Sequence, residues 1–338
     1  MTAPAAVDAL VVGAGLAGLT AARALAHAGL RVEVLEKSRG LGGRAATRRL
    51  FDTRVDHGAQ YLTARDPRFA EQVDTWLRQG VLVPWTRGFP TWRPGVGWRA
   101  APADGHERYA APEGMSALGK ALAAAAPVSR EARVTGVGRD ADGWTVAVEQ
   151  GAPRRAPRLL ITAPVPQALD LLRDVSLLPS DAAALAAVRY APCLAMVLHL
   201  RGATPPPWPA VRVVDHPDLA WIGYDGSKRA GPRPEGVVLV AHATAAFTRD
   251  RADDPPGAAK ADLLRAVATI VPWAARPDDT VLHRWRYARA ERPHRDPCVH
   301  LAPGLVLAGD GFGGDAAGRL EGAYLSGLAA AKTLLDET

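Results

Sequence analysis

The sequence predicts an α/β protein with two domains: a three-layer domain around a mostly parallel sheet, and an inserted α+β domain around a mixed sheet. Residues 8–36 open the chain with a strand, a glycine-rich turn, a helix and a second strand. Residues 305–336 return to the same pattern at the other end. Between them, short strands mix with proline-rich loops at 205–209 and 229–234, which is typical of a separate unit. We therefore expect the two ends to meet in one domain.

The opening residues form the clearest unit. Residues 8–12 are an apolar run that ends in glycine, as a buried parallel strand does. Residues 15–29 are rich in alanine and leucine and close on a glycine, which predicts a helix with its C-terminal stop. Residues 31–36 alternate as a second strand, and a loop rich in glycine and arginine follows at 38–49.

Further elements follow the same kinds of pattern. In chain order we expect helices over 67–79 and 113–126, a hairpin of strands 133–137 and 144–149, strands 159–163, 194–200, 237–242 and 305–308, and a helix over 319–336. The predicted boundaries give residues 1–65, 108–165 and 297–338 to the first domain, and residues 66–107 and 166–296 to the second.

Composition narrows the class of protein. At 338 residues, with 48% hydrophobic and 22% charged side chains, the chain has material for two globular cores. Its net charge of +6 comes almost entirely from scattered arginines, with no basic block interleaved with aromatics, so we expect no nucleic-acid partner. Arginines can also steer and hold a small substrate that bears phosphate.

Several other classes are not expected. Cys193 and Cys298 are too few for a disulfide framework, and no H-E-x-x-H or C-x-x-C occurs, so we predict no metal site. No apolar run approaches the roughly 20 residues that span a bilayer. Residues 1–8 lack the basic start of a signal peptide. We therefore expect a cytoplasmic protein without membrane contact.

The first glycine-rich turn carries the strongest motif. Gly13 permits a tight turn after the strand, Gly15 lets the backbone approach a pyrophosphate, and Gly18 lets helix and strand pack closely. The N–H groups that open the helix can bind the anion, while Glu36, at the end of the second strand, can bind an adenosine ribose. The motif residues are Gly13, Ala14, Gly15, Leu16, Ala17 and Gly18. Together these features predict a Rossmann-type dinucleotide site.

Later segments favour a flavin dinucleotide. Glycines at 40–43 let the chain pass close over a cofactor, and Arg44 can pair with phosphate. The segment Asp56–Tyr61, DHGAQY, follows shortly afterwards. A strand at 305–308 ends in Gly-Asp, and 319–324 open the last helix. A helix N-terminus directed at the N1/O2 edge of a flavin would stabilise the anionic reduced ring.

These blocks resemble the renalase-like branch of the flavin amine oxidase superfamily along the whole chain. The matching segments are GAGLAG at 13–18, GLGGRAATRR at 40–49, DHGAQYLTARD at 56–66, PEGMSAL at 112–118, HRWRYAR at 283–289, LAGDGFGG at 307–314 and GRLEGAYLSG at 318–327. DHGAQY is the most specific of them. The sequence departs from the pattern in a longer GDGFGGDAAGR loop and in Cys193, where threonine is expected, and both differences concern the substrate.

The resemblance implies non-covalent FAD. It implies that Val134 contacts adenine through its backbone, that Asp310 binds the ribityl-phosphate region and that Leu320 lies beside the isoalloxazine. The full set of expected cofactor residues adds Glu36, Lys37, Gly43, Arg44, Asp56, His57, Gly58 and Gly309 to these three and to the motif residues. The expected substrate residues are Gln60, Tyr61, Leu62, Thr63, Ala64, Cys193 and Arg319. Chemistry is expected at flavin N5, without a catalytic side chain.

The aromatic residues leave two interpretations open. Trp85, Trp92 and Trp98 either form a platform for a planar ring or pack a tryptophan-rich loop. We include Trp98 among the expected substrate residues. Trp285 and Tyr287 either face the site or fill a core.

The lysines bear on the reaction. Relatives of the amine oxidases place a lysine near flavin N5, but Lys37, Lys120, Lys228 and Lys332 are not well placed by sequence. An amine benefits from a local base, whereas a dihydropyridine needs only correct stacking. The favoured hypothesis is oxidation of 2- or 6-dihydro-NAD(P), with O2 reduced to H2O2. The alternatives are an amine or other carbon–nitrogen oxidase, and a flavin-binding sensor without turnover.

Overall fold

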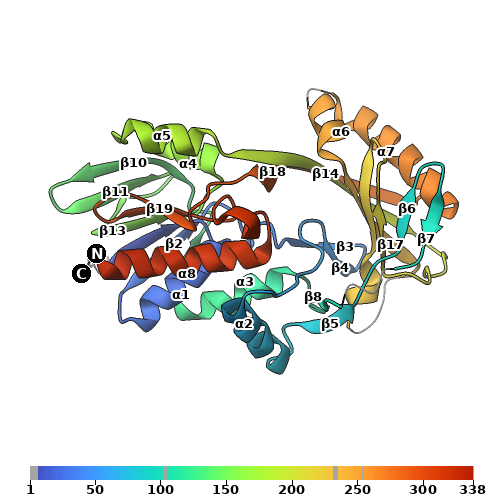
Figure 1. Ribbon diagram of the computed structural model, residues 1–338, viewed down its shortest axis with the longest axis horizontal. Coiled ribbons are helices and arrows are strands. Elements are labelled where there is room, and N and C mark those ends of the chain that lie inside the picture. The colour runs from blue at the N-terminus through green and yellow to red at the C-terminus, as the bar shows by residue number, and fades with distance from the viewer. Residues whose placement is uncertain (1–6, 102–104, 231–234, 253, 338) are drawn as a thin grey trace.

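The chain folds around two large sheets, one towards each side of the molecule, with a short hairpin between them (Figure 1). The computed structural model describes residues 7–101, 105–230, 235–252 and 254–337. The expectations for the first six residues and for the loop at 231–234 lie outside these ranges. Within them, no helix is both long enough and apolar enough to cross a membrane.

The first sheet has six strands in the order β19-β20-β13-β1-β2-β9. Their bounds are β1 Ala9–Val12, β2 Val32–Glu36, β9 Val128–Arg130, β13 Arg158–Ile161, β19 Cys298–Ala302 and β20 Leu305–Ala308. All neighbours pair in parallel except β19, which closes one edge antiparallel to β20. Every residue of β1 and β20 is buried, as expected when both faces of a parallel sheet are covered.

Two layers cover this sheet. On one face lie α1 (Leu16–His27), α3 (Ser116–Leu122) and α8 (Leu320–Asp336), with α2 (Pro67–Arg78) beside them (Figure 1). The other face carries the antiparallel strands β10 (Val134–Asp140), β11 (Gly143–Val148) and β12 (Arg154–Ala156). Helices α4 (Val165–Leu171) and α5 (Pro179–Ala186) complete that layer. The predicted three-layer architecture is confirmed.

The second sheet has seven strands in the order β18-β14-β17-β16-β15-β6-β7. They are β6 Thr91–Arg93, β7 Gly97–Arg99, β14 Arg189–Leu200, β15 Ala210–Val213, β16 Leu219–Tyr224, β17 Val237–Ala243 and β18 Asp279–Arg292. Only the β15–β6 pair is parallel, so the sheet is mixed, as predicted. Helices α6 (Ala245–Asp250) and α7 (Pro256–Ile270) cover its outer face (Figure 1).

A hairpin joins the two halves. Strand β3 (Thr47–Leu50) begins inside the loop predicted at 38–49 and pairs with β4 (Thr53–Asp56), a segment without a predicted element. Their turn holds Phe51 and Asp52 at φ of 53° and 57°, a left-handed turn without the Asn-Gly or Asp-Gly signal that would predict it. Val55 packs against three valines of β14 and β17 in the second sheet. The hairpin therefore delivers residues 56–61 to the space between the sheets.

Three helices differ from the predicted domain division. The apolar side chains of α2, Phe69, Val73 and Trp76, belong to the core around α1 and α8. Helices α4 and α5 pack Ala168 and Leu185 into the core beneath β10 and β11. All three were assigned to the inserted domain. Their amphipathic patterns specify that one face is buried, but not against which sheet. The remaining strands, β5 (Val83–Thr86) and β8 (Arg108–Ala110), form a separate antiparallel pair.

Candidate active site

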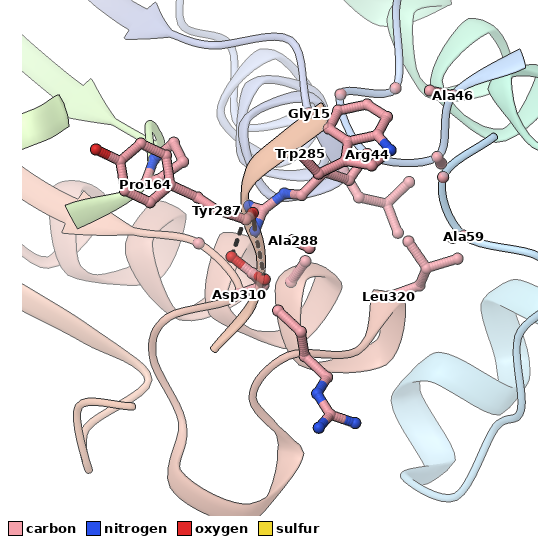
Figure 2. Close-up of a pocket in the computed structure, with 18 of the residues that line it drawn as sticks. Gly15, Arg44, Ala46, Ala59, Pro164, Trp285, Tyr287, Ala288, Asp310 and Leu320 are labelled. Atoms are coloured by element: carbon pink, nitrogen blue, oxygen red, sulfur yellow. Dashed lines mark hydrogen bonds and ion pairs between the residues drawn. The ribbon is translucent and has the colours of Figure 1, made fainter. Parts of the chain in front are cut away.

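A cavity of about 2920 Å³ extends from the glycine-rich turn of the first sheet to the inner face of the second. A pocket for a small ligand usually measures roughly 300–1,000 Å³. The cavity therefore has room for an extended dinucleotide and a second molecule. Its walls come from the turn after β1, residues 35–49, residues 57–63, strand β18 and the start of α8, and Figure 2 shows part of it.

The glycine-rich turn forms one end of the cavity. Gly13 has a φ of +107°, and a Cβ on Gly18 would lie 2.0 Å from the Gly13 carbonyl oxygen, so neither position tolerates a side chain. Gly15 caps α1 without any side-chain hydrogen bond, and a Cβ there would meet no atom within 4 Å. Because Leu16 and Ala17 line the cavity, the first N–H groups of α1 are available to an anion.

Glu36 is fixed beside this turn. Its carboxylate accepts hydrogen bonds from the backbone N–H groups of Ala14 and Ser38, each at 2.8 Å. The side chain is 92% buried yet lines the cavity. Carboxylate oxygens can accept further hydrogen bonds, so Glu36 is held in the place where a ribose hydroxyl would bind.

Arg44 and Asp310 connect the two ends of the chain. Arg44 donates to both carboxylate oxygens of Asp310 at 2.6 and 2.7 Å, and to the Tyr287 carbonyl at 3.0 Å (Figure 2). Asp310 follows β20, and the preceding Gly309 donates to Ser326 Oγ of α8 at 2.8 Å. A bidentate pair of this kind is short and geometrically specific. It fixes the loop after β2 against the end of β20.

Two backbone segments form the middle wall. His57 donates from its N–H to the Ala46 carbonyl at 3.2 Å, and Ala59 donates to the Arg44 carbonyl at 2.9 Å. A Cβ on Gly58 would lie 2.1 Å from that same Arg44 oxygen, so only glycine permits this approach. Figure 2 shows Ala59 and Leu320 on the same side of the pocket. The wall at 57–59 is therefore set by backbone pairing.

A buried group of four charges supports this wall from behind. It consists of Asp56, Asp225, Lys228 and Arg229, whose side chains are 0–4% exposed. Lys228 Nζ lies 3.1 Å from Asp56 and 3.0 Å from Asp225, while Arg229 lies 2.6 and 2.7 Å from the same two carboxylates. Burial alone would raise the pKa of Asp56, but the two cations outweigh it and lower that pKa. We call this group the charge quartet.

Lys228 also holds Gln60. Its Nζ donates to Gln60 Oε1 at 3.1 Å and lies 3.4 Å from the Gln60 carbonyl. Gln60 Nε2 donates to the carbonyls of Asp56 at 2.6 Å and Gly58 at 3.1 Å. The Gln60 amide is thus committed to the turn at 56–60 rather than free for a substrate. Sequence reasoning missed this role, because it placed Lys228 in an ordinary loop.

The second sheet supplies the opposite wall. Trp221, His242, Ala195 and His283 lie directly across from one another on β16, β17, β14 and β18, so their side chains share one face. Two residues further along the same pair of strands, Cys193 of β14 lies opposite Trp285 of β18. The Trp221, His242, Cys193, His283 and Trp285 side chains are called the aromatic wall below. All five line the cavity.

The aromatic wall contacts the middle wall through His57. The ring of Trp285 stacks on His57 with centroids 5.3 Å apart, and Trp285 Nε1 donates to the His57 carbonyl at 2.9 Å. His283 meets His57 edge-on at 4.8 Å. Sequence reasoning left Trp285 open and missed Trp221 and His242. Their strand alternation was visible, but the pairing of β16 with β17 was not.

Comparison with known proteins identifies the class. Residues 11–76 match the model of an NAD(P)-binding Rossmann-like domain, and residues 87–335 match that of flavin containing amine oxidoreductases. The chain belongs to the flavin containing amine oxidoreductase family. Renalase from Mus musculus is 28% identical over 325 residues, covering 90% of this chain and 92% of that protein. The resemblance to the renalase-like branch is thereby confirmed.

Other relatives match more locally or in fold alone. (S)-6-hydroxynicotine oxidase from Paenarthrobacter nicotinovorans is 44% identical over 73 residues, which is 20% of this chain and 17% of that enzyme. A putative protoporphyrinogen oxidase from Exiguobacterium has a TM-score of 0.73 at 14% identity, covering 99% of this chain and 100% of that one. A variant of putrescine oxidase has a TM-score of 0.76 at 14% identity, with 98% and 99% covered.

The cavity of this flavin oxidoreductase fits FAD, held non-covalently. The open glycine turn, the accessible N–H groups of α1 and the fixed Glu36 form a cradle for the adenosine diphosphate end. Val134 lines the same end, while His57, Gly58 and Leu320 line the middle. The family match and this cradle together establish the cofactor class.

The aromatic wall of this family member and the adjoining His57 are uncharged at neutral pH. Burial, followed by the neighbouring His283 and Arg48, lowers the pKa of His57 to about 4. Burial and then Lys228 lower the pKa of His242 to about 4, and burial lowers that of His283. Burial raises the pKa of the Cys193 thiol to about 12. The wall therefore offers flat, neutral rings and no thiolate.

Most of the expected site residues line the cavity. Those that do are Gly13, Gly15, Leu16, Ala17, Glu36, Lys37, Gly43, Arg44, His57, Gly58, Gln60, Tyr61, Leu62, Thr63, Val134, Cys193, Gly309, Asp310, Arg319 and Leu320. Ala14, Gly18, Asp56, Ala64 and Trp98 lie outside its lining. Asp56 belongs to the charge quartet. Among the described residues, no three side chains of histidine, cysteine or acid types could hold a metal ion together.

Of the aromatic residues whose role the sequence left open, two line the cavity and three do not. Trp98 is 40% exposed and packs on Trp208 at the far edge of the second sheet, because β7 is the terminal strand there. Trp85 packs with Phe89 away from the lining, and Trp92 contacts His216. Trp285 and Tyr287, by contrast, line the cavity. The aromatic platform therefore comes from the second sheet.

Replacement of Asp310 should weaken FAD binding. In Asp310→Ala, Arg44 loses its bidentate partner and the loop after β2 loses its anchor. Hydrogen bonds to charged groups contribute about 1.5–3 kcal/mol, so we expect FAD affinity to fall roughly 10- to 100-fold. Flavin titration measures this. Asp315→Ala, an exposed carboxylate in the same loop, is the control and should retain FAD. If Asp310→Ala binds FAD as tightly as Asp315→Ala does, the assignment of Asp310 to the FAD site is wrong.

Loss of Lys228 should destabilise the fold. Lys228→Met leaves the carboxylates of Asp56 and Asp225 with one buried cation between them. Breaking a buried ion pair from one side costs about 3–5 kcal/mol, and urea unfolding of the flavoprotein measures it. Lys332→Met removes an exposed lysine and should change stability by less than about 0.5 kcal/mol. If Lys228→Met lowers stability as little as Lys332→Met does, the charge quartet does not stabilise the fold.

Stability should fall in mild acid because of two histidines. The pKa of His57 and of His242 is about 4 in the fold and 6.5 when unfolded, so unfolding takes up protons between these values. Their stabilising contribution is complete above pH 6.5 and is lost as the pH falls towards 4, at most about 3 kcal/mol for each imidazole. Urea unfolding at pH 7.5 and pH 5 tests this. In the His57→Gln/His242→Gln double variant, stability should fall less between pH 7.5 and pH 5. If the loss of stability is as large as in the parent protein, these two histidines are not its cause.

Proposed function

We propose that the chain is an FAD-dependent oxidase of isomeric dihydronicotinamide dinucleotides. It would convert 2- or 6-dihydro-NAD(P), O2 and one proton into NAD(P)⁺ and H2O2. Bound FAD supplies the chemistry by accepting the hydride at N5 and passing two electrons to O2. The observation that carries this proposal is the combination of a neutral aromatic wall with a strongly cationic cavity.

The aromatic wall suits a flat hydride donor. Trp285 is oriented by its hydrogen bond to His57, and His57 is oriented in turn by stacking on Trp285. A dihydropyridine becomes aromatic when it loses a hydride, so it requires stacking at the correct distance rather than a base. The low pKa of His57 keeps its imidazole neutral, so it does not repel the pyridinium product.

The charges along the cavity favour an anionic substrate. Thirteen arginines and two lysines line it, against five carboxylates. Glu36 and Asp310 are already engaged with the backbone and with Arg44. FAD carries only one diphosphate, so cationic side chains remain for a second phosphate-bearing molecule. A cavity lined by one sign of charge concentrates ligands of the opposite sign.

An amine or other carbon–nitrogen oxidase is the second candidate, and the family match favours it. The lysines that line the cavity are Lys37, bonded to Gln167 beyond β2, and Lys120 on α3. Lys228 is withdrawn into the charge quartet. The cationic lining also repels protonated amines. A flavin-binding sensor without turnover remains the third hypothesis, and a cytoplasmic location remains a prediction.

Anaerobic rapid mixing separates these hypotheses. The purified holoprotein is mixed with 2- and 6-dihydro-NAD(P), with ordinary NADH and with primary amines. We expect flavin absorbance to bleach with at least one dihydro isomer much faster than with NADH, followed by stoichiometric H2O2 when O2 is admitted. Bleaching by amines alone supports the second candidate. Failure of every donor leaves the sensor hypothesis and rejects the proposed oxidase.

A further inference from the structure

Two arginines stand at the mouth of the cavity. Arg289 lies near the end of β18, and Arg319 caps the N-terminus of α8. Both side chains line the cavity and both are exposed to solvent. A residue that is exposed and also lines the cavity lies at its opening. Their guanidinium groups can therefore meet a ligand that enters from solvent.

The backbone brings these two arginines together. Gly318 has a φ of +71°, and a Cβ on it would lie 2.8 Å from Arg289 Cγ and 3.2 Å from the Ala290 carbonyl oxygen. The Arg289 side chain thus passes directly against the residue that precedes Arg319. Only glycine permits both the left-handed conformation and this close contact. The turn before α8 therefore holds the stem of the Arg289 side chain next to the residue that precedes Arg319.

An irregularity in strand β18 turns Arg289 towards the mouth of the cavity. In the β14–β18 pair, Trp285 lies opposite Cys193 but Arg289 lies opposite Ala191, so β18 contains two extra residues in between. Bulges of this kind bend a strand and redirect its side chains, often beside active sites. The Tyr287 carbonyl in this segment accepts the hydrogen bond from Arg44. The irregularity links the aromatic wall to the cavity mouth.

Neither arginine has an acidic partner in the described part of the chain. Among the residues that the structure describes, Arg289 and Arg319 form no side-chain hydrogen bond and no ion pair. Other arginines of the chain are matched, as Arg251 is by Asp262 at 2.6 Å. A bound anion that reaches both guanidinium groups would gain an attraction to each of them. The arrangement therefore fits a ligand with at least two negative charges.

We propose that Arg289 and Arg319 bind the diphosphate of the dinucleotide substrate. This inference rests on the proposed function and gives each end of the substrate a place in the cavity. The reacting ring lies against Trp285, and the diphosphate lies at the mouth. Arg289 is four positions after Trp285 along β18, a span of at most roughly 13 Å that a ribose and a diphosphate can cover. The diphosphate of FAD belongs to the glycine turn of α1 instead.

Binding of ADP-ribose to the holoprotein tests the inference without turnover. Calorimetry compares the parent protein with Arg289→Gln, Arg319→Gln and their double variant. Loss of one charge-assisted contact should weaken ADP-ribose about 10-fold, and the double loss more strongly. Arg78→Gln removes an exposed arginine of α2 outside the cavity and should leave the affinity unchanged. Unaltered affinity in the double variant overturns the inference.

A substrate comparison provides the second readout. The ratio of kcat/KM for the dihydro dinucleotide to kcat/KM for the matching dihydronicotinamide riboside reports the diphosphate contribution alone. We expect this ratio to fall about 10-fold in each single variant and to stay constant in Arg78→Gln. A constant ratio in all variants overturns the inference. If neither donor reduces the parent flavin, the proposed function fails, while ADP-ribose binding still decides the role of the arginines.

Discussion

The site depends on the charge quartet of Asp56, Asp225, Lys228 and Arg229. Its two anions come from the hairpin of the first domain and the end of β16 in the second, and its two cations follow β16. Isolated buried charges are prohibitively unfavourable, so each half of the quartet requires the other. This mutual requirement fixes the distance between the wall at 57–59 and the aromatic wall. The space for a cofactor and a substrate is what remains between them.

Sequence reasoning succeeded where chemistry is local. The turn at 13–18 and Glu36 lie within one β-α-β unit, and that unit imposes glycine, helix start and carboxylate at fixed spacing. It did not identify Lys228, Trp221 or His242. Their roles depend on the pairing of β16 and β17 and on contact with residue 60, more than 150 positions away along the chain. The sequence also did not specify which sheet α2, α4 and α5 pack against, because an apolar stripe indicates a buried face but not the surface that covers it.

The cavity separates two kinds of interaction. Near the middle, rings with low pKa values and a protonated thiol form a surface that neither attracts nor repels charge. Towards the opening lie Arg289 and Arg319, which have no carboxylate partner among the residues that the structure describes. Charge placed away from the reacting ring can provide affinity without altering the reaction itself, which is how remote binding energy serves catalysis. The same division explains why a catalytic side chain is unnecessary in the proposed oxidation.

The Arg44–Asp310 pair has a consequence for biosynthesis. Its partners are 266 residues apart, so β20 and Asp310 are made long after β2 and Arg44. Until β20 is made, β13 lacks its neighbour on one side, which leaves an unpaired apolar edge of the kind that promotes aggregation. Capture of FAD therefore requires β20 and Asp310 in addition to the glycine-rich turn. Maturation of this flavoprotein depends on a contact between two segments that the ribosome makes at widely separated times.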